Sequence, residues 1–184
     1  MIKTKGLFLD RDGIVNEDRC YVYQIKDFHF IEGIFELCRE AIKQDYKIVI
    51  ATNQAGIGRG YYTEEDFHYL TRWMRSKMSS RGVKLEGVYY CPHHPIHGIG
   101  DYRRDCENRK PRPGMLLRAS SELNIDLEKS VIIGDKLSDL QAGRAAGIKT
   151  KVLLSSDPKE KNELNDAHIF NSLSEVLTWF RARS

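Results

Sequence analysis

Short apolar runs that end in polar residues, separated by segments with helical periodicity, constrain this chain most. The first run, residues 6–9, stops at Asp10-Arg11-Asp12-Gly13, as a buried strand ending in a polar turn would. Further strands are expected at residues 47–51, 87–90, 130–133 and 151–154. Strands that alternate with helices in this way predict an α/β fold, with a doubly wound, mainly parallel sheet and helices on both faces.

The segments between these runs have the spacing of helices that bury one face. Apolar residues at i, i+3, i+4, i+7 and i+8 mark the first helix, namely Ile34, Leu37, Cys38, Ala41 and Ile42. A second helix is expected at about 64–80, where Thr63 and Asp66 form a variant of the capping box. Three more are expected at 113–123, 137–146 and 173–183, with Pro113 in a first turn and Gly147 as a stop.

Length, composition and charge exclude several classes of protein. The chain has 184 residues, which suits one domain over 1–184. No apolar run approaches the roughly 20 residues that span a bilayer, and the run after Lys3 and Lys5 is too short for a signal peptide. The net charge of +3 is small for a nucleic-acid binder. Four cysteines without an export signal favour reduced thiols or metal ligands, so we expect a cytoplasmic protein. No long apolar stripe lies beyond the expected core faces, so we expect a monomer.

Polar side chains follow the ends of the expected strands. These residues are Asp10, Asp12, Thr52, Asn53, Cys91 and Asp135. Because the carboxyl ends of parallel strands meet at one edge of a sheet, these positions should converge there. Gly13 allows the backbone to turn after Asp12, so that both neighbouring carboxylates can face one site.

The residue types at this edge suit a metal ion and a phosphate. Carboxylates from Asp10, Asp12 and Asp135 are the oxygen ligands that Mg²⁺ prefers. A hydroxyl, an amide and a compact cation for phosphate oxygens come from Thr52, Asn53 and Lys110, beside a loop with glycines at 56, 58 and 60. Together these groups predict phosphoryl transfer.

Four motifs, in order along the chain, resemble those of the haloacid dehalogenase superfamily of phosphatases. They are Phe8-Leu9-Asp10-Arg11-Asp12-Gly13, Ile50-Ala51-Thr52-Asn53-Gln54, Lys110-Pro111, and Gly134-Asp135-Lys136 through Asp139. More narrowly, the sequences at 91–95, 109–115 and 134–139 are similar to those of heptose bisphosphate phosphatases, and this resemblance covers nearly the whole chain. One such motif alone is often a polar turn, so the signal lies in the ordered set.

The resemblance implies a capless domain with a Rossmann-like sheet and a two-step displacement. Asp10 would attack phosphorus to form an aspartyl phosphate, while Asp12 would protonate the leaving sugar oxygen and later act as base on water. The implied Mg²⁺ site comprises Asp10, the Asp12 carbonyl and Asp135, with Lys136 as a neighbour. The implied substrate contacts are Asp18, Thr52, Asn53, Gln54, Arg59, Arg109 and Lys110, with Asp139 orienting Lys136 or Lys110.

The implied reaction is removal of the C7 phosphate from D-glycero-D-manno-heptose 1,7-bisphosphate, on the route to the ADP- or GDP-heptose of lipopolysaccharide. Arg109 precedes Lys110 and suits a second phosphate or sugar hydroxyls. Histidinol-phosphate phosphatases share these motifs and are the alternative, and the preferred anomer stays open. Phosphate transfer to an acceptor other than water also stays open. A noncatalytic module that binds nucleic acid is disfavoured, because the acidic cluster would repel a polyanion.

The segment at about 91–110 is expected to be a metal-binding insertion. In the family that the chain resembles, a zinc loop carries Cys-x-His and later Cys-x-Cys. Here the first half is Cys91 and His93, but the second half reads Cys106-Glu107-Asn108, which puts a poor zinc ligand at the fourth position. The set could be completed around Zn²⁺ by His94, His97, Asp105 or a water, or the loop could hold no metal.

Overall fold

Six parallel strands form the middle layer of the computed structural model, which describes residues 3–155 and 166–183. The strands are β1 (Thr4–Leu9), β2 (Tyr46–Asn53), β3 (Leu85–Cys91), β4 (Ile125–Gly134), β5 (Thr150–Leu154) and β6 (His168–Phe170). Their spatial order is β3-β2-β1-β4-β5-β6, so the chain winds outward from β1 in one direction and from β4 in the other. Ligands bind at the switch point of such a sheet, beyond the carboxyl ends of its central strands.

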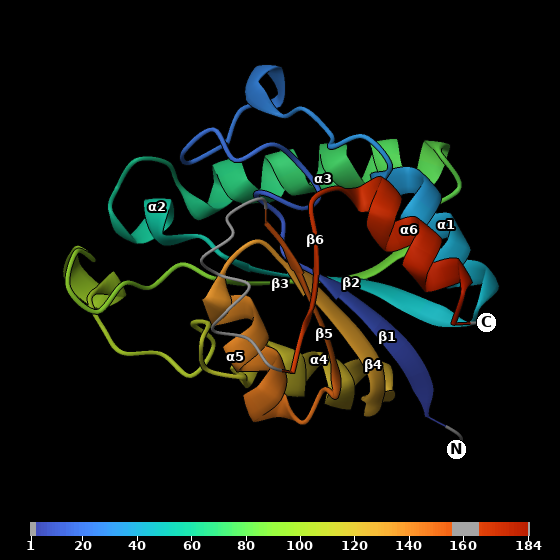
Figure 1. The fold of residues 1–184 in the computed structure, drawn as a ribbon. Helices are drawn as coiled ribbons and strands as arrows, with labels where there is room; N and C mark the ends of the chain where they lie inside the picture. The colour runs from blue at the N-terminus through green and yellow to red at the C-terminus, as the bar shows by residue number, and fades with distance from the viewer. Residues whose placement is uncertain (1–2, 156–165, 184) are drawn as a thin grey trace.

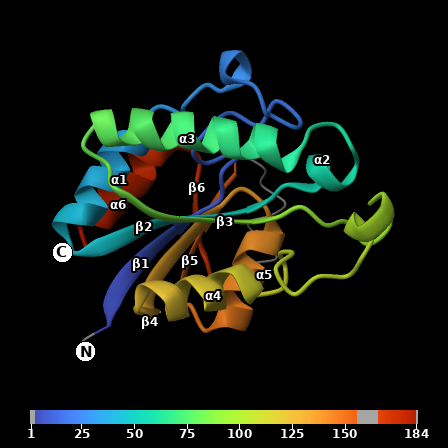
Figure 2. The same cartoon turned by 180° about the vertical axis from the view of Figure 1, so that it is seen from behind.

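Helices cover both faces of this sheet, which confirms the doubly wound α/β fold predicted from the sequence (Figures 1 and 2). One face carries α1 (Ile34–Lys43), α3 (Glu64–Ser80) and α6 (Leu173–Arg181), and the other carries α4 (Gly114–Leu123) and α5 (Leu137–Ala146). A single-turn helix, α2 (Ala55–Gly58), directly follows β2, and 3₁₀ turns occur at Ile25–Asp27 and Gly100–Tyr102. Within the described ranges, no helix is both long and apolar enough to cross a membrane.

The central strand β1 shows why its sequence is continuously apolar. Leu7 and Leu9 belong to the core cluster that includes residues of α1, α3 and α6, whereas Phe8 packs with Leu116 of α4. Successive side chains of a strand point to opposite faces, and both faces are covered here. The apolar run therefore ends only where the chain leaves the sheet, and the next residue is Asp10.

Local signals place the helix ends as predicted. Thr63 and Asp66 form the expected capping box, in which the Thr63 Oγ1 accepts from the Asp66 amide at 3.1 Å. Gly147 ends α5 in the left-handed conformation, at φ 88°. The first cap fixes the start of α3, at the edge of the sheet where the strands have their carboxyl ends. The second cap fixes the end of α5, at the opposite edge.

The structure differs from the expectations at three elements. Strand β4 begins at Ile125 rather than 130, because Ile125 and Asp126 already pair with the start of β1 before a register shift, and mainly polar residues follow them up to Ser130. Their side chains are mostly partly or fully exposed, so they carry no apolar signal. Helix α2 and strand β6 were not predicted, since four and three residues are too few for a periodicity.

Candidate active site

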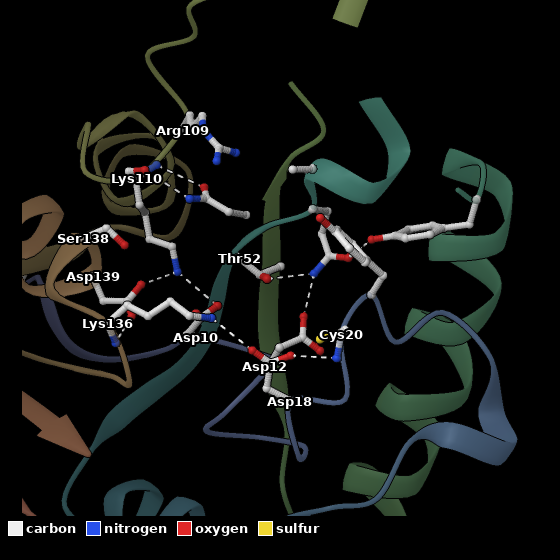
Figure 3. A pocket seen from close by; sticks show the side chains of 15 residues that line it. Asp10, Asp12, Asp18, Cys20, Thr52, Arg109, Lys110, Lys136, Ser138 and Asp139 are labelled. Carbon is white, nitrogen blue, oxygen red and sulfur yellow. Dashed lines mark hydrogen bonds and ion pairs between the residues drawn. The ribbon is translucent and has the colours of Figure 1, made fainter. Parts of the chain in front are cut away.

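A pocket of about 460 Å³ opens beyond the carboxyl ends of β1, β2 and β4 (Figure 3). Most residues proposed for the site from the sequence line it, namely Asp10, Asp12, Asp18, Thr52, Asn53, Gln54, Arg109, Lys110, Lys136 and Asp139. Asp135 adjoins Asp10 and Asp139. Arg59 is not among the described residues that line this pocket. Its guanidinium lies 5.8 Å from the ring centroid of Tyr21, which does line the pocket.

Lys110 places a buried cation inside this pocket. Its Nζ lies 3.0 Å from Asp10 Oδ1 and 2.6 Å from Asp139 Oδ1, and it donates to the Ala51 carbonyl at 2.7 Å. The Asn53 side chain pins the Lys110 backbone, because it accepts from the Lys110 amide and donates to its carbonyl, each at 3.1 Å. Burial alone would lower the pKa of Lys110, but the two carboxylates outweigh it and raise that pKa, so the side chain stays charged.

Asp10 continues the hydrogen bonding of β1 into the site. Its amide donates to the Ile133 carbonyl of β4 at 3.1 Å, and its Oδ1 accepts from the Arg11 amide at 2.7 Å. Burial raises the pKa of Asp10 to about 7, with Lys110 opposing and Asp139 adding to the rise. The ionised carboxylate that nucleophilic attack requires therefore depends on nearby positive charge.

The acidic cluster fits a hard cation such as Mg²⁺. Carboxylate oxygens of Asp10, Asp135 and Asp139 lie within 4.8 Å of one another. Asp139 is already engaged, because its two oxygens face Lys110 Nζ and the Lys136 amide. Asp135 Oδ1 is buried and has no hydrogen-bond partner among the described residues, as expected of an oxygen that serves a metal ion. Burial also raises the pKa of Asp135, to about 6.

Gly13 makes room for this cluster. Its φ of 91° lies in the left-handed region, and a Cβ at this position would stand only 2.3 Å from Asp135 Oδ2. The turn that the sequence predicted after Asp12 therefore requires glycine for two separate reasons.

Asp12 is held by donors on both of its oxygens. Oδ1 accepts from Asn16 Nδ2 at 3.0 Å, and Oδ2 accepts from Gln54 Nε2 at 3.0 Å. Arg11 forms an ion pair with the same carboxylate at 2.9 Å, although its side chain is almost fully buried. Sequence reasoning missed Arg11 and Asn16; the available signal was a charged and a polar residue flanking a buried strand end.

Two further contacts shape the rim of the pocket. Lys136 Nζ lies 3.1 Å from Asp18 Oδ2, which draws the segment after β1 toward the start of α5. Arg109 Nη1 donates to the His93 carbonyl at 3.1 Å, so the segment from β3 to α4 holds this guanidinium at the pocket.

That same segment brings together a cysteine and histidine cluster. Ligand atoms of Cys91, His93 and Cys106 lie within 4.8 Å of one another, a set that suits Zn²⁺. Burial raises the pKa of the Cys91 thiol to about 12, so a metal would have to displace its proton. Asp105, one of the residues weighed as a fourth ligand, forms an ion pair with Arg112.

The chain is similar over nearly its whole length to phosphatases from several bacteria. Residues 107–176 match the family model of HAD-hydrolase-like proteins. The D-glycero-beta-D-manno-heptose-1,7-bisphosphate 7-phosphatase of Yersinia pestis is 46% identical over 180 residues, covering 97% of this chain and 96% of that protein. The D-glycero-alpha-D-manno-heptose-1,7-bisphosphate 7-phosphatase of Campylobacter jejuni is 45% identical over 182 residues, covering 99% of each.

A solved structure extends the similarity to three dimensions. The crystal structure of D,D-heptose 1,7-bisphosphate phosphatase from B. bronchiseptica, complexed with magnesium and phosphate, has a TM-score of 0.83 and 26% identity to this chain. The match covers 98% of this chain and 99% of that one.

Proposed function

Because this chain belongs to the family of D-glycero-manno-heptose-1,7-bisphosphate 7-phosphatases, within the haloacid dehalogenase superfamily, we propose that it removes the C7 phosphate of D-glycero-D-manno-heptose 1,7-bisphosphate. The observation that carries the proposal is the convergence of Asp10, Lys110 and Asp135 at the carboxyl ends of neighbouring strands. The named relatives reported above act on the alpha or the beta anomer, and none is a histidinol-phosphate phosphatase.

In the first step, Asp10 attacks the C7 phosphorus. The described contacts of this carboxylate use Oδ1, so we assign the attack to Oδ2. A bond forms between Oδ2 and phosphorus while the bond from phosphorus to the sugar oxygen breaks. Lys110 and the Thr52 hydroxyl face the same pocket and stabilise the phosphoryl oxygens.

Asp12 moves the proton in both steps. It donates a proton to the leaving sugar oxygen and becomes a carboxylate, then takes a proton from the water that attacks the aspartyl phosphate. In the second step a bond forms between the water oxygen and phosphorus while the bond from phosphorus to Asp10 Oδ2 breaks, which releases inorganic phosphate and restores Asp10 and Asp12 to their starting states. Gln54 and Arg11 hold the Asp12 side chain beside the pocket.

Mg²⁺ would be held by Asp10 and Asp135, with the Asp12 carbonyl as a third protein ligand. When bound, it would reduce the repulsion between an anionic nucleophile and an anionic phosphate. The unpartnered Asp135 Oδ1 supports this assignment, and Lys136 next to it supplies further positive charge.

We also propose that Cys91, His93 and Cys106 hold a structural Zn²⁺. The link to the pocket is the hydrogen bond from Arg109 to the His93 carbonyl, so an ordered loop would keep the guanidinium in place for the C1 phosphate or the sugar hydroxyls. The side-chain oxygen of Asn108 lies close to Gly114, at the start of α4.

That the enzyme is cytoplasmic and monomeric, without nucleic-acid or membrane partners, remains a prediction.

The experiment that tests the function is phosphate release with Mg²⁺ from three substrates, the α and β anomers of the heptose bisphosphate and histidinol phosphate. The ratio of kcat/KM values reports discrimination between their transition states. We expect at least about a hundredfold preference for one heptose anomer over histidinol phosphate, which corresponds to about 2.7 kcal/mol. A preference for histidinol phosphate would contradict the proposed substrate, while the proposed two-step mechanism would still apply. Asp10→Asn, measured in parallel, accounts for contaminating phosphatases.

A further inference from the structure

The side chain of Gln54 is fully committed to protein partners at the edge of the pocket. It is 2% exposed, and its Nε2 donates to Asp12 Oδ2 at 3.0 Å and to Thr52 Oγ1 at 2.9 Å. Gln54 therefore joins the proposed proton donor to a proposed phosphate contact.

Tyr62 occupies the other end of this amide. Its hydroxyl donates to Gln54 Oε1 at 2.6 Å, and the tyrosine is 6% exposed. A carboxamide has its acceptor on one side and its two donors on the other. Because the hydroxyl engages the oxygen, both N–H groups of Gln54 face Asp12 and Thr52.

The Tyr62 ring is itself fixed in place. It stacks on Tyr23 with ring centroids 5.1 Å apart and planes inclined by 4°. Gly56 provides the space for it, since a Cβ there would lie 2.3 Å from Tyr62 Cε1. Burial raises the pKa of Tyr62 above its usual value, so its hydroxyl keeps the proton that it donates.

Without the hydroxyl, Gln54 Oε1 would be a buried acceptor with no partner, and such groups are costly. The amide would then turn or move to find a donor, and the N–H groups would leave Asp12 and Thr52. Turning the amide over would also bring its oxygen toward Asp12, and when Asp12 is ionised the two acceptors repel each other. The placement of Asp12 thus depends on Tyr62, which lines the same pocket but has its hydroxyl bonded to Gln54.

We propose that Tyr62 is a positioning residue for the phosphatase reaction, acting through the Gln54 amide to set where the Asp12 side chain stands. The proposal rests on the proposed function in one respect, which is that Asp12 protonates the leaving oxygen. Because the Tyr62 hydroxyl donates to Gln54 Oε1, this contribution requires no contact between Tyr62 and the substrate.

The test compares Tyr62→Phe with a matched control, Tyr23→Phe. Both changes remove one hydroxyl from the same pair of stacked rings, but the Tyr23 hydroxyl bonds to Gln24 instead of Gln54. For each variant, kcat/KM is measured with the heptose bisphosphate and with p-nitrophenyl phosphate, whose leaving group departs without a proton. Because kcat/KM covers the steps up to departure of the leaving group, the comparison isolates the delivery of the proton by Asp12.

We expect Tyr62→Phe to lower kcat/KM for the sugar phosphate by about tenfold or more, and for p-nitrophenyl phosphate by less than about threefold. Tyr23→Phe should leave both values within about twofold of the parent enzyme. The two substrates are compared on one preparation, so any loss of folded enzyme cancels from the ratio. Equal losses on both substrates, or no loss on either, would overturn the proposal.

A double-mutant cycle tests the route through Gln54. If Tyr62 acts only through that amide, Tyr62→Phe should add less than about twofold in a Gln54→Ala background. An undiminished effect there would overturn the proposed route. If the parent enzyme cleaves p-nitrophenyl phosphate but not the heptose bisphosphate, the proposed function fails separately, and glycerol 3-phosphate then serves as the alkyl ester in the same ratio.

Discussion

Lys110 and Asp139 form an ion pair of 2.6 Å in which each side chain is only 2% exposed. The same Asp139 carboxylate accepts from the Lys136 amide at 3.1 Å, at the start of α5. Asp139 thus connects α5 to the cation that faces Asp10. The Asp139 carboxylate therefore contacts the ammonium group of Lys110 and the backbone amide of Lys136, the two residues that the sequence analysis expected it to orient.

Replacing Asp139 by asparagine should weaken both the fold and the reaction. Removing one partner of a buried pair typically costs about 3–5 kcal/mol, but Asp10 still faces Lys110, so we expect a loss of about 2 kcal/mol in the free energy of unfolding. We expect kcat to fall by about tenfold or more, because Lys110 loses its fixed position. Urea denaturation and phosphate release measure the two effects. The control is Asp126→Asn, which removes an ion pair with the exposed Lys129 and should leave the free energy of unfolding nearly unchanged. Equal costs for the two variants would contradict the prediction.

Asp10→Asn should abolish turnover while leaving the protein folded. The amide keeps the shape of the carboxylate, and it removes a buried acid whose pKa is raised to about 7. We expect kcat to fall by at least about a thousandfold, since no nucleophile remains to form the aspartyl phosphate. Phosphate release gives the rate, and the melting temperature reports the fold. Parent-like activity in this variant would rule out Asp10 as the nucleophile.

Mg²⁺ should stabilise the protein more at high pH than at low pH. The folded-state pKa values of Asp10 and Asp135 are raised to about 7 and 6, above the ordinary 3.8, so the metal-free folded state binds more protons than the unfolded state between these values. The free energy of unfolding contributed by these groups therefore falls as pH rises through that window. Mg²⁺ competes with the same protons, so its effect on the melting temperature should be larger at about pH 8 than at about pH 5.

Thermal denaturation with and without Mg²⁺ at the two pH values measures this difference. Asp135→Asn removes one of the two titrating groups and a proposed ligand, so it should show a smaller response to Mg²⁺ at both pH values. A response that is the same at both pH values in the parent enzyme would contradict the prediction.

Arg109→Ala should affect a bisphosphate more than a monophosphate. Its guanidinium is held at the pocket by the His93 carbonyl and suits a second anionic group. We expect kcat/KM for the heptose 1,7-bisphosphate to fall by about a hundredfold, and that for heptose 7-phosphate by less than about threefold. Arg104→Ala, from the same loop but outside the described lining of this pocket, is the matched control. Parallel losses on both substrates would assign Arg109 to the C7 phosphate instead.

Asn108→Cys should strengthen zinc binding. Cys91, His93 and Cys106 supply three ligand atoms, and a thiolate at 108 would restore the pattern of the family that the chain resembles. We expect the dissociation constant for Zn²⁺ to fall by at least about tenfold, as measured by competition with a chromogenic chelator. Glu107→Cys adds a thiol at the neighbouring, largely exposed side chain and should leave the constant unchanged. An unchanged constant for Asn108→Cys would place residue 108 away from the metal.

The sequence predicted best those residues that end a strand. Asp10 and Thr52 lie where buried apolar runs stop, and parallel strands bring such ends to one edge whatever their separation in the chain. The extended start of β4 was missed because the polar residues after Ile125 give no periodic signal. An apolar run in the sequence shows where a buried strand lies, whereas an exposed strand end made of polar residues leaves no such pattern.

Residues on the loops were harder to place. Arg59 was expected to contact substrate, yet it packs beside Tyr21 outside the described lining. Tyr62 was not singled out at all, although its hydroxyl reaches Gln54. Both outcomes depend on the path of the chain after β2, and neither charge nor spacing in the sequence specifies that path.

The amide of Asp10 belongs to the sheet itself, through its hydrogen bond to Ile133. The backbone of the proposed nucleophile is therefore tied to the sheet, while the segments that carry Arg109 and Tyr62 lie outside the strands. Mutations that accumulate in those segments over evolution can change which phosphate ester is admitted without disturbing the attacking oxygen. Related enzymes can thus come to act on different phosphate esters while they keep the same reaction.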